Sequence, residues 1–271
     1  MIWIVLAIIC VVITIFYFNM TAVRPVPSWL NEYQYAHRGL HTAEYPENSM
    51  PAFKSAMENG YAIELDVHLS KDGVLMVFHD DDMERMTGAQ GRIEDFTVDE
   101  LKQRRLASSE YQIPTLDEVL YLVDGGTPLL IELKNMGRAG KLEVELYNRM
   151  KEYAGKFAIQ SFSPFSVRWF YKNAPNILRG QLSATFYCGA EAIPRWQRWT
   201  LRHLLTNVMC RPNFINYEQS GVRRCVIKRL RRAGLPILAW TVRTREQQAE
   251  IQPFVDALVF ENMIPEEKQD A

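Results

Sequence analysis

Short apolar runs recur along most of this chain, and segments with helical spacing of their apolar residues lie between them. The runs have the length and continuity of strands that are buried on both faces. Helical segments such as residues 49–59, 141–152 and 222–233 separate most of them. Eight strands are predicted, at residues 34–36, 62–67, 129–133, 157–160, 177–182, 214–217, 237–242 and 257–260. This alternation predicts a parallel sheet, either closed as an α/β barrel or open and doubly wound.

The second predicted strand carries polar residues at every other position. Glu64, Asp66 and His68 alternate with apolar residues, so their side chains share one face of the strand. In a barrel, such residues at the carboxyl end of a strand belong to the site where ligands bind. The same pattern is also compatible with a polar hairpin on the protein surface.

The residues that follow predict a tight hairpin. Asp-Gly at residues 72–73 is typical of a two-residue type I′ turn, which pairs Lys71 with Val74. Counting back from that turn places Asp66 opposite His79. Because opposed residues of a hairpin point to the same face, we expect the side chains of Asp66 and His79 to converge.

The first residues form a different pattern, an almost unbroken apolar run at residues 2–18. A helix needs about 20 residues to cross roughly 30 Å of hydrocarbon, and the residues after the run supply the missing length. A signal peptide carries basic residues before such a run and a small-x-small cleavage site after it, and neither is present. A buried core helix would carry a polar face. We therefore predict a single transmembrane helix at residues 2–20, a linker at 21–33 and a barrel domain at 34–265.

The composition narrows the function classes. Hydrophobic residues make up 48% of the chain and charged residues 23%, which suits a globular core, and the net charge of −1 gives no overall attraction to nucleic acid. The four cysteines show neither a disulfide framework nor a zinc-ligand spacing. Arg24 is the nearest charge after the apolar run and favours the cytoplasmic face of the membrane for the domain.

Two later segments are rich in basic residues. Residues 184–212 form an insertion between two predicted strands, in which arginines share one helical face and tryptophans flank them: Arg195, Arg198, Arg202, Trp196 and Trp199. This arrangement suits a helix at a membrane interface, but an ordinary helix that covers the barrel is slightly favoured over it. The basic run at residues 222–233 is typical of a solvated barrel face, although an anionic membrane would attract it.

The polar residues around the predicted hairpin form a set suited to phosphate chemistry. His37 and Arg38 precede it, and Glu64, Asp66 and His79 belong to it. A hard divalent cation prefers carboxylate oxygens, and a phosphoryl group is neutralised by a metal and a guanidinium. Histidine transfers protons near neutral pH. Acyl transfer by serine has no support, because no Gly-x-Ser-x-Gly motif is present.

Eight ordered motifs cover roughly residues 34 to 262. They are AHRG at 36–39, PENS at 46–49, ELDV at 64–67, KDG at 71–73, HD at 79–80, IPTLDEV at 113–119, IELK at 131–134 and WTV at 240–242. In these motifs the chain resembles the glycerophosphodiester phosphodiesterase family. It departs from the family's common pattern at Arg243, where Asn is frequent, and at residues 260–263, where Thr-Asp and a proline are frequent. Both departures are expected at the rim that contacts substrate, so the identity of the substrate's alcohol stays open.

The resemblance implies a closed TIM barrel with a hairpin excursion after the second strand. It also implies a metal site. Glu64, Asp66 and Glu132 are the predicted ligands, and three carboxylates from adjacent strands suit Ca²⁺ or Mg²⁺. On residue type alone, Glu132 is equally a strand-end charge paired with Lys134, and the match to the IELK motif favours the metal role.

Among the histidines, His37 and His79 are predicted to act as catalytic acid and base. One would deprotonate the attacking oxygen, and the other would protonate the leaving alkoxide. His68 is expected at the rim of the hairpin and His41 on a surface loop.

Four further residues receive supporting roles. Arg38 is predicted to bind the phosphate through its guanidinium fork, with Lys134 adding a second positive charge. Trp240 is expected to form an apolar wall for the alcohol part of the substrate, although a core position is equally open to it. Glu47 is predicted to orient Arg38 or a histidine from behind.

These residues predict a membrane-anchored enzyme that hydrolyses glycerophosphodiesters to glycerol 3-phosphate and an alcohol. Attack by water and attack by the glycerol 2-hydroxyl through a cyclic phosphate both remain open. One alternative is lysophospholipase D activity on single-chain membrane lipids. Another is an inactive membrane-tethered barrel that binds a phospholipid headgroup. The predicted partners are the small-molecule or lysolipid substrate and the bilayer, with no nucleic-acid or protein partner.

Overall fold

The computed structural model describes residues 25–135, 137–186 and 193–266, together with single positions between Trp3 and Thr14. Most of the transmembrane helix predicted at residues 2–20 lies outside these described residues. Within them, no helix combines the length and the apolar character needed to cross a membrane.

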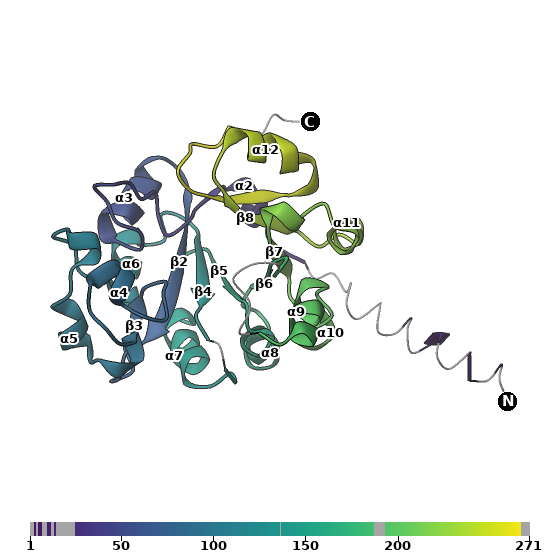
Figure 1. Ribbon diagram of the computed structural model, residues 1–271, viewed down its shortest axis with the longest axis horizontal. Coiled ribbons are helices and arrows are strands. Elements are labelled where there is room, and N and C mark those ends of the chain that lie inside the picture. The colour runs from purple at the N-terminus through teal and green to yellow at the C-terminus, as the bar shows by residue number, and fades with distance from the viewer. Residues whose placement is uncertain are drawn as a thin grey trace.

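Eight parallel strands form a closed barrel with helices around its outside (Figure 1). The strands are β1 (Tyr35–Ala36), β2 (Ala62–Leu69), β4 (Leu129–Leu133), β5 (Phe157–Ser161), β6 (Arg179–Ser183), β7 (Phe214–Glu218), β8 (Ile237–Val242) and β9 (Ala257–Phe260). Each pairs with its neighbour, and β1 pairs in parallel with both β9 and β2, which closes the ring. The predicted TIM barrel is confirmed, and the open doubly wound alternative is wrong.

Amphipathic helices cover the barrel. They are α3 (Met50–Glu58), α6 (Leu116–Val123), α7 (Lys141–Met150), α8 (Pro164–Asn173), α9 (Arg195–Arg202), α10 (Asn207–Cys210), α11 (Cys225–Arg232) and α12 (Arg245–Ile251), with the 3₁₀ turns η3 (Gln219–Gly221) and η4 (Gln252–Phe254). The start of α6 follows from its sequence, since the Thr115 side chain accepts from the Glu118 amide and the Glu118 carboxylate accepts from the Thr115 amide. The main core lies between these helices and the strands.

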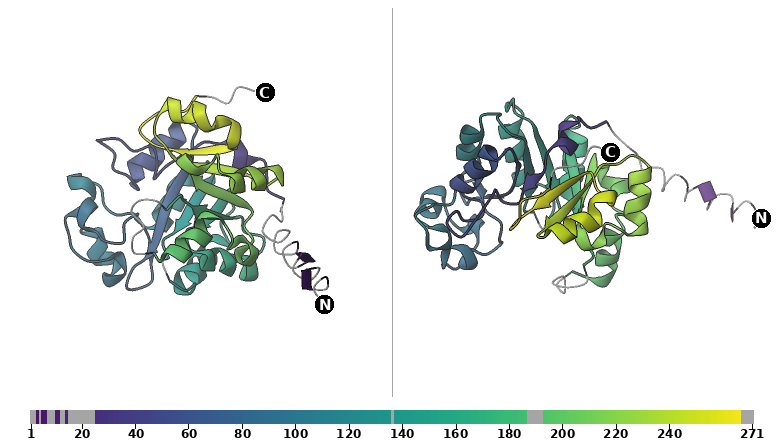
Figure 2. Two further views of the ribbon diagram at one scale, coloured as in Figure 1. Left: turned by 45° about the vertical axis from the view of Figure 1, so that its right-hand side comes forward. Right: turned by 90° about the horizontal axis from the view of Figure 1, so that it is seen from above.

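The excursion after β2 forms a small lobe at the side of the barrel (Figures 1 and 2). It contains β3 (Leu75–Val77), α4 (Glu84–Thr87), α5 (Val98–Lys102) and the 3₁₀ turns η1 (Ile93–Asp95) and η2 (Leu106–Ser108). The lobe has an apolar cluster of its own, made of Met76, Phe78, Met83, Met86, Ile93, Leu101, Leu106 and Ile113. It therefore holds a fixed position beside the carboxyl ends of the strands.

The predicted hairpin exists, but its predicted register is wrong. Leu69 faces Leu75, and the Ser70 amide donates to the Val74 carbonyl oxygen at 2.9 Å, so the loop holds three residues rather than two. Gly73 takes a left-handed conformation with φ +86°, as a three-residue loop requires. Asp66 consequently faces Phe78, whose amide donates to the Asp66 carbonyl oxygen at 3.1 Å, and His79 lies one position further along.

The amino-terminal end of the barrel is closed by α2 (Trp29–Glu32). Trp29 and Leu30 are buried in an apolar cluster that also contains residues from the strands, among them Tyr35, Leu130 and Phe214. Residues 29–32 lie within the stretch predicted as a linker. The chain is thus already packed against the barrel before the first strand begins.

Candidate active site

Three carboxylates meet at the carboxyl end of the barrel, as the sequence predicted. Glu64 and Asp66 point inward from β2, and Glu132 comes from the neighbouring β4, where it pairs in register with Asp66. Each offers one oxygen, and these oxygens all lie within 4.8 Å of one another. All three side chains are buried, at 2%, 1% and 7% exposure.

Burial and mutual repulsion disfavour the ionised forms of these carboxylates, so a bound cation would stabilise them. Burial raises the pKa of Glu64 well above its usual value, and the nearby charges of Asp66 and Glu132 raise it further. Burial also raises the pKa of Glu132. Burial would raise the pKa of Asp66 too, but Lys134, His79 and Arg38 hold it below its usual range.

Two cations face the three carboxylates. Lys134 Nζ lies 3.1 Å from Glu132 Oε1 and 3.6 Å from Asp66 Oδ1, and Arg38 Nε lies 3.7 Å from Asp66 Oδ2. With every carboxylate ionised, the cluster keeps an excess of negative charge in a buried position. An all-oxygen set of this kind fits a hard divalent cation such as Ca²⁺ or Mg²⁺.

Buried amides orient the carboxylates, and the sequence analysis did not identify these amides as part of the site. Asn48 Nδ2 donates to Asp66 Oδ2 at 2.9 Å, and Gln160 Nε2 donates to Glu64 Oε1 at 3.2 Å. Asn216 Nδ2 in turn donates to Gln160 Oε1 at 2.9 Å. Gln160 and Asn216 are buried polar residues that each follow an apolar residue within a strand, and this polar position was the signal available in the sequence.

His37 follows β1 directly and is held by a carboxylate from the other end of the chain. Its Nδ1 lies 2.5 Å from Oε2 of Glu261, the residue after β9. Burial lowers the pKa of His37 below its usual 6.5, against the opposite influence of Glu261. Burial therefore favours the neutral imidazole. With Nδ1–H donating to Glu261, Nε2 is left as the unprotonated nitrogen.

Glu261 is itself fixed in an ionised form. Arg243 Nε donates to its Oε1 at 2.6 Å, and His41 Nε2 lies 3.7 Å from its Oε2. Burial would raise the pKa of Glu261, but the interactions with His37, His41 and Arg243 lower it strongly. The two places where the sequence departs from the family's common pattern thus contact each other. Glu261 lies behind His37, and His41 is nearer the site than a surface loop would place it.

His79 has a carboxylate partner as well. Its Nδ1 lies 2.6 Å from Asp80 Oδ1, and Asp80 Oδ2 accepts from Arg85 Nε at 2.6 Å. Burial would raise the pKa of Asp80, but the hydrogen bonds from His79 and Arg85 lower it. Interaction with His79 is one of the causes that lower the pKa of Asp66, and it opposes the rise in the pKa of Glu132.

Glu47 connects the two histidine neighbourhoods. Its Oε1 accepts from Arg38 Nη1 at 2.7 Å and from Arg85 Nη2 at 2.6 Å. Arg38 sits in a turn with positive φ at residues 38 and 39, and Gly39 there passes so close to α3 that a Cβ would lie 2.8 Å from the Ala52 carbonyl carbon. This packing fixes the direction in which Arg38 leaves β1. Glu47 orients Arg38, one of the two roles foreseen for it.

An aromatic wall stands on the other side of the barrel mouth. Trp240 in β8 is half-buried, and its Nε1 donates to the Ser183 carbonyl oxygen at 3.2 Å. Phe162 contacts Trp240 edge to face at 5.4 Å between ring centroids, and Phe186 contacts Phe162 at 6.4 Å.

His68, expected at the rim, is instead buried, with Nε2 3.5 Å from the His79 carbonyl oxygen.

Residues 37–263 match the glycerophosphoryl diester phosphodiesterase family. The chain belongs to this family. It is 32% identical over 241 residues to the glycerophosphodiester phosphodiesterase of Caldanaerobacter subterraneus, covering 84% of this chain and 93% of that protein. It is 22% identical over 244 residues to human glycerophosphodiester phosphodiesterase 1, covering 79% and 72% of the two chains. The family resemblance seen in the motifs is thereby confirmed.

Solved structures of the family agree with the fold. An Oleispira antarctica phosphodiesterase in complex with the product sn-glycerol-3-phosphate superposes with a TM-score of 0.69 at 26% identity, covering 84% of this chain and 92% of that one. The glycerophosphodiester phosphodiesterase of Thermotoga maritima gives a TM-score of 0.65 at 27% identity, covering 84% and 94%.

Proposed function

We propose that this protein hydrolyses glycerophosphodiesters to glycerol 3-phosphate and an alcohol with the help of a divalent cation. The observation that carries this proposal is the buried group of Glu64, Asp66 and Glu132 beside two histidines that are each held by a carboxylate. The names of its relatives support it, as does the product in the Oleispira structure. An inactive headgroup-binding barrel is disfavoured, because every proposed catalytic and metal position is filled.

The cation, held by Glu64, Asp66 and Glu132, would neutralise charge on the phosphoryl group and on the oxygen that attacks or leaves. Arg38 and Lys134 border the same carboxylates, so they bind the phosphate from the protein side. Glu47 keeps the Arg38 guanidinium in place.

His37 and His79 divide the proton transfers. His37, neutral and with Nε2 free of its proton, accepts the proton of the attacking oxygen as the new P–O bond forms. The bond from phosphorus to the alcohol oxygen breaks, and His79 donates a proton to that oxygen. The attacking oxygen belongs either to water, which gives glycerol 3-phosphate directly, or to the glycerol 2-hydroxyl, which gives a cyclic phosphate that water then opens.

The activity is tested by screening residues 24–271 against glycerophosphocholine, glycerophosphoethanolamine and lysophosphatidylcholine, with Ca²⁺ and Mg²⁺ supplied separately. We expect glycerol 3-phosphate to be released from the soluble diesters and the release to stop in chelator. Turnover of the lysolipid alone would favour lysophospholipase D, which the aromatic wall of Trp240, Phe162 and Phe186 makes the second candidate. Headgroup binding without any hydrolysis would favour the inactive barrel.

The proposal includes a membrane anchor at residues 2–20, supported by the apolar run in the sequence. We expect the full-length protein to resist extraction by high salt and to yield to detergent. Deleting residues 1–23 should release an active domain, because every proposed catalytic residue lies at or after His37. Arg24 favours the cytoplasmic face for that domain, and we therefore expect protease added outside intact cells to spare it. Release of the full-length protein by salt alone would contradict the anchor.

A further inference from the structure

Helix α9 presents an exposed basic and aromatic face that the proposed chemistry does not use. Trp196 is 70% exposed and Trp199 is 51% exposed, whereas Leu201 on the opposite side of the helix is buried. At about 100° per residue, Arg198, Arg202, Arg195, Trp199 and Trp196 follow one another around an arc of roughly 160°. The Arg-Trp arc, as we call these five residues, is continuous, with Arg195, Trp196 and Trp199 exposed and Arg198 and Arg202 partly buried.

The charge of this region has one sign. Residues 193–217 contain four arginines and no aspartate or glutamate. No carboxylate among the described residues forms an ion pair with Arg195 or Arg198. Arg223 on the barrel surface, by contrast, pairs with Glu250. The Arg-Trp arc therefore favours an anionic partner.

The arc is fastened to the end of the barrel where the active site opens. Ser183 Oγ at the end of β6 donates to the Leu201 carbonyl oxygen at 2.9 Å. Tyr217 Oη near the end of β7 donates to the Arg202 carbonyl oxygen at 3.0 Å. The Ser183 carbonyl oxygen is the one that accepts from Trp240 of the aromatic wall. A surface that rests on this helix is thus held beside the barrel mouth.

A pocket of about 430 Å³ opens on the same face. Its lining consists of Phe186, Arg195, Arg198, Trp199 and Arg202. Guanidinium groups bind phosphate oxygens through paired N–H donors. Indole rings prefer the boundary between the headgroups and the acyl chains of a bilayer, because they combine an apolar body with one polar N–H. Arginine and tryptophan together match the surface of an anionic bilayer better than they match a soluble phosphate.

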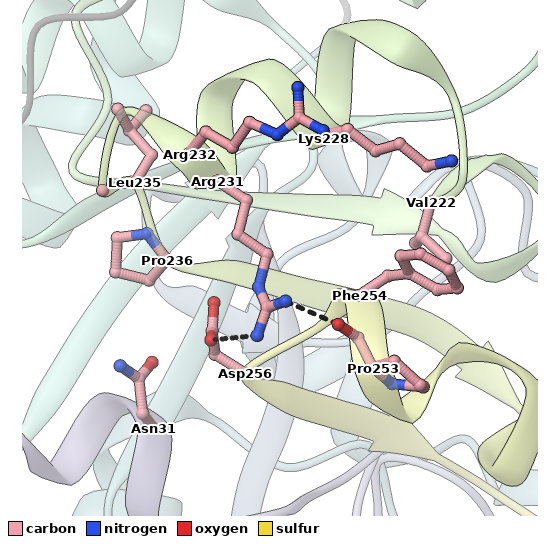
Figure 3. Close-up of a pocket in the computed structure, with 11 residues that line it drawn as sticks. Asn31, Val222, Lys228, Arg231, Arg232, Leu235, Pro236, Pro253, Phe254 and Asp256 are labelled. Atoms are coloured by element: carbon pink, nitrogen blue, oxygen red, sulfur yellow. Dashed lines mark hydrogen bonds and ion pairs between the residues drawn. The ribbon is translucent and has the colours of Figure 1, made fainter.

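A second basic pocket, of about 650 Å³, provides a comparison (Figure 3). It is lined by Lys228, Arg231 and Arg232 of the α11 region and by residues that precede β8 and β9, so it lies at the opposite end of the barrel. Arg231 is already bound there, with Nη1 2.5 Å from the Pro253 carbonyl oxygen and Nη2 3.3 Å from Asp256 Oδ1. No tryptophan lines it. It has positive charge without the aromatic component.

We propose that the Arg-Trp arc of α9 is a docking surface for a bilayer that contains anionic phospholipids. Its arginines bind headgroup phosphates, and Trp196 and Trp199 enter the interface. Docking holds the barrel mouth beside the bilayer, because α9 is fastened to the ends of β6 and β7. The binding step is independent of hydrolysis, so it stands or falls apart from the proposed activity.

The test uses residues 24–271, which keep all eight parallel strands and the helix α2 that closes the amino-terminal end of the barrel. The match to the Caldanaerobacter relative covers 93% of that protein and 84% of this chain, so we expect this part of the chain to fold without the apolar run. Sedimentation with sucrose-loaded vesicles of equal parts phosphatidylcholine and phosphatidylglycerol measures binding. We expect Arg195→Gln/Arg198→Gln to weaken partitioning about thirtyfold, since each basic residue near such a surface strengthens binding roughly fivefold. Trp196→Ala/Trp199→Ala should weaken it similarly and abolish the blue shift of tryptophan fluorescence.

The matched control is Lys228→Gln/Arg232→Gln, which removes the same charge from the α11 pocket. It should bind vesicles as the unmodified domain does, and melting temperatures should agree among all variants. Equal losses from the α9 and α11 pairs would overturn the proposal, because net charge alone would then explain binding. Equal binding to pure phosphatidylcholine vesicles, or no binding to either kind, would overturn it as well.

Discussion

Asp66→Ala is expected to abolish hydrolysis of glycerophosphodiesters together with the response to divalent cations. The substitution removes the carboxylate that faces both Arg38 and Lys134 and that pairs in register with Glu132. Two carboxylates then remain opposite two cations, and the excess negative charge that favours a divalent cation is lost. Calorimetric titration with Ca²⁺ and Mg²⁺ and the rate of glycerol 3-phosphate release measure the two effects.

Glu64→Gln separates loss of the metal from loss of the fold. Burial and the neighbouring carboxylates raise the pKa of Glu64, so its charge opposes folding when no cation is bound. A raised native pKa means that the native state binds more protons, and the free energy of unfolding therefore falls as pH rises above the ordinary glutamate value. In chelator this variant should melt at or above the melting temperature of the unmodified protein while showing no cation response.

Turnover by Asp66→Ala in chelator at the rate of the unmodified protein would end the metal-site hypothesis.

The alternation of strands and helices was predictable because its determinants are local, whereas closure of the sheet into a barrel was predicted from the family resemblance. The alternation of polar and apolar residues along the second strand singled out Glu64 and Asp66, and Glu132 was assigned to the metal site through the IELK motif. The prediction of the hairpin register failed because the register depends on a contact that is distant in the sequence. Asp72 bonds to Ser70 Oγ and to the Val98 amide of the lobe, and Gly73 takes a positive φ, which gives a three-residue loop. An Asp-Gly pair alone does not reveal the contact with a residue so much further along the chain.

The partner of His37 was missed because it lies 224 residues away. Only closure of the barrel, with β1 beside β9, brings Glu261 next to His37. The amides of Gln160 and Asn216 were missed although the sequence contains a signal for them. Polar residues in the middle of apolar strands must find partners when buried, and here those partners are each other and Glu64.

His37→Ala and His79→Ala are each expected to lower kcat by about 10²-fold or more, the usual scale for loss of a general acid or base. Both rings lie at the barrel mouth, so the melting temperature should change little. His41→Ala is the matched control, since its ring lies 3.7 Å from Glu261 but has no proposed proton to transfer. Steady-state kinetics on glycerophosphocholine measures the differences. Equal losses for His41→Ala and His79→Ala would show that the catalytic roles are assigned to the wrong rings.

Glu261→Gln shows whether His37 is the base. Glu261 raises the pKa of His37 against the effect of burial, so an uncharged glutamine should let that pKa fall further. The base must be neutral to act, and the acidic limb of the kcat/KM profile should therefore move to lower pH. At neutral pH kcat should still drop, because His37 becomes a weaker base and loses the acceptor that holds Nδ1–H, while KM changes little. An acidic limb that stays in place, or that moves to higher pH, would assign the base role to His79.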